Sequence, residues 1–522
     1  MAGERSWWGW GYTANALSDA ECSALAAQLP GLASEPLPIP DLGDIGLPEP
    51  RLVPPQSLAP VVSAAAADRA AHTYGKAYRD VVRALHGDLS SAPDLVAHPR
   101  SETDIASLLD WAGSLGLAVV PYGGGTSVVG GVEYRGSSHA GVLSLDLSGM
   151  DKVLEVDPVS RAARIQAGAL GPVLEDRLRP QGYTLRHFPQ SFEFSTLGGW
   201  LATRAGGHYA TVTTHIDDFV ESLRVVTPVG VSESWRLPGS GAGPSPDRLF
   251  LGSEGTLGVI TEAWMRLQDR PVYKASAAVL FTDFAPALDA VRAVAQSGLN
   301  PANCRLLDAG EAALSGAATS GENVLVLGFE SAHLPVEDRL ADAVGIASQH
   351  GGAVQERGEP GGLDAVGSWR SAFLRMPYIR DGLARMNAIV ETFETACTWD
   401  RALDLVEAVR SEVAATVREV TGADGMINCR ITHVYPDGVA PYFTVIAAGR
   451  RGSELAMWDE IKTAAMEVLN RHRATITHHH AVGRDHRPGY DRQRPEPFAV
   501  ALRAAKDALD PSGVLNPGVL IS

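Results

Sequence analysis

The residues best suited to chemistry are three adjacent histidines, His478, His479 and His480. Imidazoles titrate near neutral pH, so they suit proton transfer to and from a reacting carbon. A histidine cluster also suits a metal ion, but neighbouring side chains of an extended segment point to opposite faces. Only His478 and His480 would share a face without a bend, so the spacing favours acid–base chemistry and we assign no metal.

A second reactive candidate is Tyr442, which lies near the turn of a predicted hairpin. The segment 427–445 has two apolar ends that flank Pro436-Asp437-Gly438, a turn signal. His433 and Tyr442 stand near this turn on opposite strands, so both could face one cavity. A tyrosine in a strand more often packs than reacts, and packing is the alternative for Tyr442.

A candidate for anion binding is Arg380, in the segment Pro377-Tyr378-Ile379-Arg380-Asp381. An arginine set among apolar residues usually has a specific anionic partner. A solvated surface position is the alternative for any one arginine of this region.

These side chains need a scaffold, and the most informative part of it is the loop Pro121 to Ser127. The run 117–120 before it reads as a short buried strand. Three consecutive glycines let a ligand approach the backbone, and their amides, with the Thr126 and Ser127 hydroxyls, could form a nest for a pyrophosphate. The contiguous glycines and the lack of a following lysine exclude a Rossmann fingerprint and a P-loop.

Two later segments have a similar character. Residues 188–207 are dense in Ser, Thr and Gly between apolar anchors, and residues 251–261 carry three glycines in the run LGSEGTLGVIT. Short hydroxyls and bare amides suit an extended polar cofactor that lies along the backbone.

The composition limits the class of protein. The chain has 522 residues, 45% of them hydrophobic, which is typical of a globular protein of two to four domains. A net charge of −17 argues against nucleic acid as a partner. The cysteines are far apart and fit a reducing cytoplasm, and no apolar run is long enough to span a membrane. We therefore expect a cytoplasmic protein.

The order of elements divides the chain into four parts. An N-terminal extension, residues 1–86, has a tryptophan-rich start and a predicted helix over 64–85. Its aromatic residues either plug another domain or form the lip of an apolar channel. Residues 87–270 combine strands, helices and the three segments above, residues 271–465 alternate strands with helices, and residues 466–522 carry the histidines.

The three cofactor-like segments, in this order and spacing, resemble the FAD-binding domain of the vanillyl-alcohol-oxidase superfamily. The ending Leu509 to Gly518 resembles the FAD-linked oxidase type of C-terminal domain. The resemblance implies an α+β fold: an FAD-binding domain of the vanillyl-alcohol-oxidase (PCMH) type and an α/β cap domain. The glycine loop has no His or Cys for attachment, so we expect non-covalent FAD. The residues assigned to the cofactor are Pro121, Gly123, Gly124, Gly125, Thr126, Ser127, Gln190, Ser191, Ser195, Thr196, Thr203, Arg204, Gly206, Glu254, Gly255, Thr256, Leu257, Gly258, Val259 and Ile260.

Within this superfamily, hydroxy-acid dehydrogenases usually carry a Gly-Glu-His-Gly segment and a metal segment with two histidines. Here His479 stands where the Glu is expected, and the second metal histidine is replaced near Tyr442. The chain instead resembles the alkyldihydroxyacetonephosphate synthase family, whose motifs match Trp8 to Tyr12, Tyr378 to Asp381, Phe393 to Thr395, Tyr442-Phe443 and His478 to His480.

The resemblance implies a flavin-dependent exchange with no net oxidation, in which a fatty alcohol replaces the acyl group of acyl-dihydroxyacetone phosphate. Tyr442 would accept a proton, helped by positive charge from the histidines. His479 and His480 would stabilise or relay protons, and Arg380 would bind the phosphate, with Arg305 as a second candidate. A homodimer and a peripheral membrane contact are further expectations. An oxidase or dehydrogenase of a hydroxy acid or alcohol is the alternative activity, and a flavin- or lipid-binding protein is the third alternative.

Overall fold

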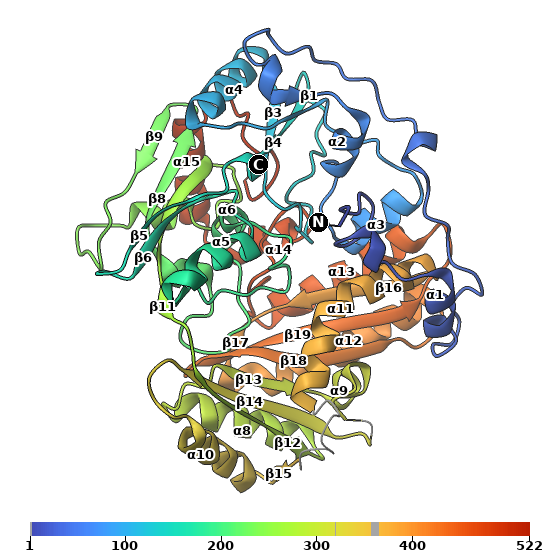
Figure 1. The fold of residues 1–522 in the computed structure, drawn as a ribbon. Helices are drawn as coiled ribbons and strands as arrows, with labels where there is room; N and C mark the ends of the chain where they lie inside the picture. The colour runs from blue at the N-terminus through green and yellow to red at the C-terminus, as the bar shows by residue number, and fades with distance from the viewer. Residues whose placement is uncertain (1–2, 319, 356–364, 522) are drawn as a thin grey trace.

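The computed structural model describes residues 3–318, 320–355 and 365–521. Two main sheets and one two-stranded sheet in residues 62–269 form one half of the molecule, and a larger sheet in residues 273–448 forms the other (Figure 1). Both ends of the chain lie in or beside the first half (Figure 1). The last residues return there, since Leu515 pairs in parallel with Val119. The chain thus crosses from one half to the other and back, which creates an interface between the two.

The N-terminal extension contains α1 (Asp19–Ala26), α2 (Ala66–Ala71) and α3 (Tyr78–Leu85). The single helix predicted over 64–85 is wrong, because residues 72–77 form a loop between α2 and α3. This loop presses against the glycine loop: Lys76 N donates to Ser127 O at 2.6 Å, and a Cβ on Gly75 would lie 2.3 Å from the same oxygen. The tertiary contact replaces the helical hydrogen bonds at this point.

The first sheet has the order β1-β2-β4-β3. Strands β2 (Leu95–Ala97), β4 (Val142–Asp146) and β3 (Ala118–Tyr122) are parallel, whereas the short β1 (Val62–Ser63) pairs antiparallel with β2. Helix α4 (Glu102–Leu115) connects β2 to β3, and the side chain of Ser101 caps it by accepting from Asp104 N. The strand β3 leads directly into the glycine loop.

The second sheet is antiparallel, with the order β5-β6-β10-β8-β9. Its helix α6 begins at Leu197, where the Thr196 hydroxyl caps it by accepting from Gly199 N. Strands β5 and β6 form an antiparallel hairpin. The strands are β5 (Val153–Asp157), β6 (Ala162–Gln166), β8 (Val220–Thr227), β9 (Gly230–Glu233) and β10 (Val259–Arg266), with helices α5 (Gly171–Leu178), α6 (Leu197–Thr203) and α7 (Pro246–Phe250) and the small pair β7 (Tyr183–Thr184) and β11 (Gln268–Asp269).

The cap sheet has the order β15-β12-β14-β13-β18-β19-β16, with β17 on β19, and every pairing is antiparallel. Strands and helices alternate along the chain as predicted, but the sheet is not of the parallel kind that alternation often gives. Its strands are β12 (Tyr273–Phe281), β13 (Asn303–Leu307), β14 (Asn323–Ser331), β15 (Ala353–Val354), β16 (Ala388–Glu394), β17 (Cys397–Thr398), β18 (Met426–Val434) and β19 (Gly438–Ala448), and its helices are α8 (Phe284–Gln296), α9 (Ala309–Ser315), α10 (Glu337–Gln349), α11 (Ala365–Arg385) and α12 (Ala402–Thr421).

The side-chain alternation of these strands separates core from cavity. On β18, Cys429 and Ile431 enter hydrophobic clusters, while Arg430 faces the opposite side. On β19, Phe443 lies in the core and Tyr442 faces the cavity. The register of the pair shifts between Ile431 and His433, and this irregularity allows both Thr432 and His433 to line the cavity.

The C-terminal return contains α13 (Glu454–Arg471), α14 (Arg487–Gln493) and α15 (Glu496–Leu509). Helix α13 runs across residue 465 and ends at Arg471. In the part of the chain that the structure describes, no helix combines the length and apolarity that crossing a bilayer requires.

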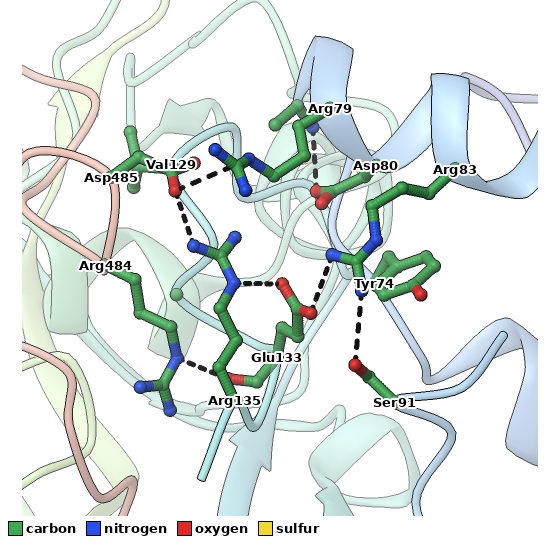
Figure 2. A network of polar contacts seen from close by, with 12 residues as sticks. Tyr74, Arg79, Asp80, Arg83, Ser91, Val129, Glu133, Arg135, Arg484 and Asp485 are labelled. Atoms are coloured by element: carbon green, nitrogen blue, oxygen red, sulfur yellow. Dashed lines mark hydrogen bonds and ion pairs between the residues drawn. The ribbon is translucent and has the colours of Figure 1, made fainter. Parts of the chain in front are cut away.

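A buried network of charges holds the return in place (Figure 2). Arg135 lies 2.7 Å from both Glu133 and Asp485, and Arg83 contacts the other oxygen of Glu133 at 2.7 Å. Arg484 Nε also donates to Glu133 O at 2.6 Å. These contacts tie the segment after the histidines to α3 and to the strand-like segment that follows the glycine loop.

Candidate active site

A cavity of about 630 Å³ lies between the two halves. This volume is in the range of small-molecule and cofactor sites. One wall is formed by the glycine loop, the 188–207 segment and the 251–261 segment, and the other by β16, β18, β19, α11 and the histidine segment. The three cofactor-like segments of the sequence therefore meet in one place.

The glycine loop is held close to the 188–207 segment. A Cβ on Gly124 would lie 1.7 Å from Phe194 O, and Gly125 has φ of +66°. A side chain at position 124 would clash with this carbonyl, and a residue other than glycine at position 125 would strain the backbone. In the described part of the chain, no protein acceptor is found for the backbone amides of Gly124, Gly125 and Thr126, which are near the cavity. Such a cradle of amides fits the pyrophosphate of FAD.

Seventeen of the predicted cofactor residues line the cavity. Three do not: Arg204 pairs with Asp217 at 3.0 Å, Thr256 donates to Ser253 O, and Leu257 is fully buried in the core. These three support the fold around the site, and local sequence could not separate them from their neighbours. The lining residues are Pro121, Gly123, Gly124, Gly125, Thr126, Ser127, Gln190, Ser191, Ser195, Thr196, Thr203, Gly206, Glu254, Gly255, Gly258, Val259 and Ile260.

Glu254 joins the cofactor wall to the histidine segment. Its carboxylate accepts from Val482 N at 2.9 Å and from Gly483 N at 2.8 Å, and burial raises its pKa to about 7. Asn516 donates to Glu254 O at 2.7 Å, so the chain end that resembles the oxidase domain also fixes this wall.

The cap wall carries the predicted reactive groups. Tyr442 is buried and lies opposite Arg430 in the β18–β19 ladder, with the guanidinium carbon 3.8 Å from the centre of the phenol ring. His433 also lines the cavity, and its Nε2 lies 2.9 Å from Gly207 O. The expectation that Tyr442 and His433 face one cavity is confirmed.

The three histidines do not share faces as an extended segment would. The chain bends here, and His479 and His480 line the cavity while His478 points away from it. His478 Nε2 lies 2.6 Å from the Tyr435 hydroxyl, and its Nδ1 lies 2.9 Å from His479 Nδ1. Because the chain bends, the extended geometry in which His478 and His480 would share a face does not occur.

Glu394 causes the bend. Its buried carboxylate accepts from the backbone amides of His478, of His479 at 3.1 Å and of His480 at 2.7 Å, and from the Thr477 hydroxyl at 2.7 Å. Burial raises its pKa, whereas the hydrogen bonds from the His478 amide and the Thr477 hydroxyl lower it; His480 and His478 would lower it further only when they carry a positive charge.

The histidines are neutral at physiological pH. Burial lowers the pKa of His478 and His479 well below the ordinary value and that of His480 in the same direction. Burial therefore works against the positive charge that these histidines were expected to supply to Tyr442. The cation beside Tyr442 is Arg430, and neutral imidazoles can accept or pass protons instead.

Both predicted anion-binding arginines line the cavity. Arg380 forks onto Asp381 Oδ1 through Nε at 2.9 Å and Nη2 at 2.6 Å, and its Nη1 donates to Lys76 O. Asp381 also accepts from Trp10 N at 2.6 Å, so the tryptophan-rich start of the chain fixes this pair. Arg305 is buried, and burial together with Arg430 lowers its pKa to about 9.

The remaining part of the cavity is apolar. Trp10 lines it, so the aromatic start both packs against another domain and borders a channel. Helices α1, α9 and α11 supply most of the other apolar residues. They are Leu25, Leu29, Ala313, Leu314, Met376, Ile379 and Leu383, together with Val390, Met426 and Ile446 from the sheet.

Comparisons with known proteins agree with this arrangement. Residues 93–233 match the family described as FAD binding domain, and residues 270–520 match FAD linked oxidases, C-terminal domain. The chain is 32% identical over 480 residues to alkyldihydroxyacetonephosphate synthase of Trypanosoma brucei brucei, covering 87% of this chain and 77% of the relative. The Dictyostelium discoideum synthase is 32% identical with the same coverage. The chain belongs to the alkyldihydroxyacetonephosphate synthase family.

A solved alkyldihydroxyacetonephosphate synthase structure has the same fold, with a TM-score of 0.82 over 98% of this chain and 97% of that chain at 26% identity. The cofactor of this family member is FAD. The α+β class with an FAD-binding domain and an oxidase-type cap is confirmed.

Two residues of this synthase-family site were missed by sequence reasoning. Glu394 lies in the Phe393–Thr395 motif, but nothing local indicates that it turns the histidine segment. Arg430 could have been found from the sequence. Two strands that pair about a turn centred near Pro436 place residue 430 opposite residue 442.

Proposed function

We propose that this protein exchanges the acyl group of acyl-dihydroxyacetone phosphate for a fatty alcohol, with no net redox change. The observation that carries the proposal is the placement of Tyr442, with the neutral His479 and His480, across one cavity from the glycine cradle. A phenol and two imidazoles can move protons without an external electron acceptor.

Each residue has a role that its position supports. Tyr442 accepts the proton from the carbon that bears the acyl ester, and His480 and His479 relay it. Arg380, oriented by Asp381, binds the phosphate with its remaining N–H groups, and Arg305 adds positive charge at the same cavity. The apolar residues of α1, α9 and α11 exclude water around the alkyl chain.

FAD would be held by the amides of the glycine loop and by the lining residues of the two later segments. When bound, it would supply an electron-accepting ring beside the reacting carbon, with no net change in its oxidation state over a turnover. None of the four cysteines lines the cavity, which supports non-covalent binding. Acid or heat should therefore release free flavin into the supernatant, and flavin that stays with the denatured chain would contradict this.

The test is an exchange assay under argon. Purified holoenzyme receives palmitoyl-dihydroxyacetone phosphate and radiolabelled hexadecanol, without oxygen, dye or quinone. We expect label in an ether product and one released fatty acid for each ether formed. Absence of labelled ether, with turnover of a hydroxy acid that requires an acceptor, would favour the alternative activity.

A peripheral membrane contact belongs to the same proposal, because both chains of the substrate pair are poorly soluble. The cavity residue Leu314 is 37% exposed, and Leu374 on α11 is 60% exposed. Sedimentation with phosphatidylcholine vesicles should carry the protein down, and Leu314→Glu should reduce that binding. We also expect a homodimer, which analytical ultracentrifugation measures.

A further inference from the structure

Arg430 and Glu311 form a buried ion pair at the back of the Tyr442 ring. Arg430 Nη1 lies 3.0 Å from Glu311 Oε2, and the two side chains are 8% and 4% exposed. The same guanidinium covers the face of Tyr442, with 3.8 Å between its carbon and the ring centre. A charge so close to the phenol acts directly on its acidity.

The pair is held rigidly from the helix side. Asp308 caps α9 by accepting from Glu311 N at 2.8 Å, and Thr444 Oγ1 donates to Glu311 Oε1 at 2.6 Å. Gly310 lets α9 approach β18 closely, since a Cβ there would lie 2.1 Å from Asn428 Oδ1. Glu311 is thereby fixed, and it fixes Arg430.

The groups that face Tyr442 come from four elements. Burial raises the pKa of Tyr442, as do Glu311 on α9 and Glu394 on β16, whereas Arg430 on β18 and a hydrogen bond with Thr392 on β16 lower it. From the histidine segment, His479 stacks at 6.2 Å between ring centres and His480 meets it edge-on at 5.5 Å, and both are neutral. Among these facing groups, Arg430 is the cation.

We propose that Arg430 is a positioning residue that orients the Tyr442 ring and stabilises its phenolate. The negative charge of Glu311 partly offsets the effect of the Arg430 guanidinium on the phenol. This inference rests on the proposed role of Tyr442 as the proton acceptor. The proton moves from the substrate carbon to the Tyr442 oxygen, and Arg430 keeps its charge throughout. The two partners of the ion pair therefore act on Tyr442 with opposite signs.

The first test uses that opposition. Arg430→Met removes the cation, and Glu311→Gln keeps the shape and the Thr444 acceptor but removes the anion. We expect the phenol of Tyr442 to titrate about one pH unit or more higher in Arg430→Met and lower in Glu311→Gln. The tyrosinate absorbance of each variant is measured against the same variant carrying Tyr442→Phe. Equal titrations in all three proteins, or shifts of the same sign, would overturn the proposal.

The second test asks whether a more acidic phenol at position 442 compensates for the loss of the Arg430 charge. Arg430→Met should lower kcat of the exchange at least about tenfold at neutral pH, while Arg430→Lys recovers most of it. A fluorinated tyrosine at position 442 should restore Arg430→Met activity by a larger factor than it changes the wild type. A purely structural role for Arg430 predicts no such recovery.

Flavin content and thermal stability identify variants that fail to fold, and Arg410→Met is the matched control. Arg410 pairs with Asp308 at 2.7 Å near the same helix but does not line the cavity. If Tyr442→Phe keeps full exchange activity, the proton-acceptor role fails. The ultraviolet titration then still decides whether Arg430 and Glu311 act on the phenol.

Discussion

The two walls of the cavity are built from opposite kinds of residue. The cofactor wall consists mainly of glycines, hydroxyls and backbone amides, and its close contacts involve the main chain, as at Gly124 and Phe194. The cap wall carries Arg305, Arg380, Arg430 and the ring of Tyr442 with its neighbouring imidazoles. The first wall holds a ligand by shape, and the second places charge and proton acceptors against it.

This difference predicts that substitutions in the two walls fail in different ways. A change in the cap wall should remove turnover and leave the flavin bound. A change in the cofactor wall should remove the flavin itself. The predictions below follow from this contrast.

The largest effect is expected for Tyr442→Phe. Losing the proton acceptor should lower the exchange rate about a thousandfold, within the usual range for a general base, because the rest of the wall is unchanged. Flavin absorbance of the purified variant should match that of the wild type. Tyr78→Phe is the control, since Tyr78 is also buried, donates to Ala388 O at 2.8 Å and lies outside the cavity. A flavin-free Tyr442→Phe protein would contradict the expectation that changes in the cap wall leave the flavin bound.

In the cofactor wall, Gly124→Ala should abolish flavin binding. The added Cβ would meet Phe194 O at 1.7 Å, so the loop or the 188–207 segment must move and the amide cradle is lost. The ratio of flavin to protein absorbance measures this, and we expect a fall of at least about tenfold. Gly239→Ala is the control, because nothing lies within 4 Å of a Cβ there. Retention of flavin by Gly124→Ala would show that the loop does not cradle it.

Sequence reasoning found the two walls with unequal success. The cofactor wall depends on runs of neighbouring residues, such as the loop Pro121 to Ser127, so local spacing was sufficient. The cap wall depends on strand register and on a bend, and no local pattern indicates that Glu394 turns the histidine segment toward the cavity. The break between α2 and α3 was missed for a similar reason, because it results from a contact with Ser127 far along the chain.

A smaller effect is expected for Arg380→Lys. Lysine keeps the charge but cannot fork onto Asp381, so the phosphate loses an oriented partner. We expect KM for the phosphorylated substrate to rise about tenfold with flavin content unchanged. Arg375→Lys on the same helix is the control, because Arg375 is 58% exposed and pairs with Glu21. Normal KM in both variants would place phosphate binding elsewhere, for example at Arg305.

The smallest effect is expected for Asp80→Asn. Asp80 belongs to the buried network of charges that holds the C-terminal segment in place, outside both walls of the cavity (Figure 2). Burial, with Glu133 and Asp485 nearby, raises the pKa of Asp80 to about 7. The folded protein therefore binds a proton that the unfolded chain releases above its ordinary pKa, and stability falls as pH rises toward and through 7. Asp80→Asn is neutral and lacks this penalty. Its thermal midpoint relative to wild type should increase by roughly 2 °C or more from pH 5 to pH 8. A constant difference would show that Asp80 stays charged.

The central claim is that the cavity performs an exchange without net redox chemistry, and the anaerobic flavin spectrum tests it most directly. Holoenzyme is mixed in the absence of oxygen with acyl-dihydroxyacetone phosphate and a fatty alcohol, and separately with D-lactate. We predict that the oxidised flavin absorbance is fully present after many turnovers of the first mixture and is not bleached in the second. Rapid bleaching by D-lactate or a related hydroxy acid, with no ether formed in the first mixture, would contradict the account.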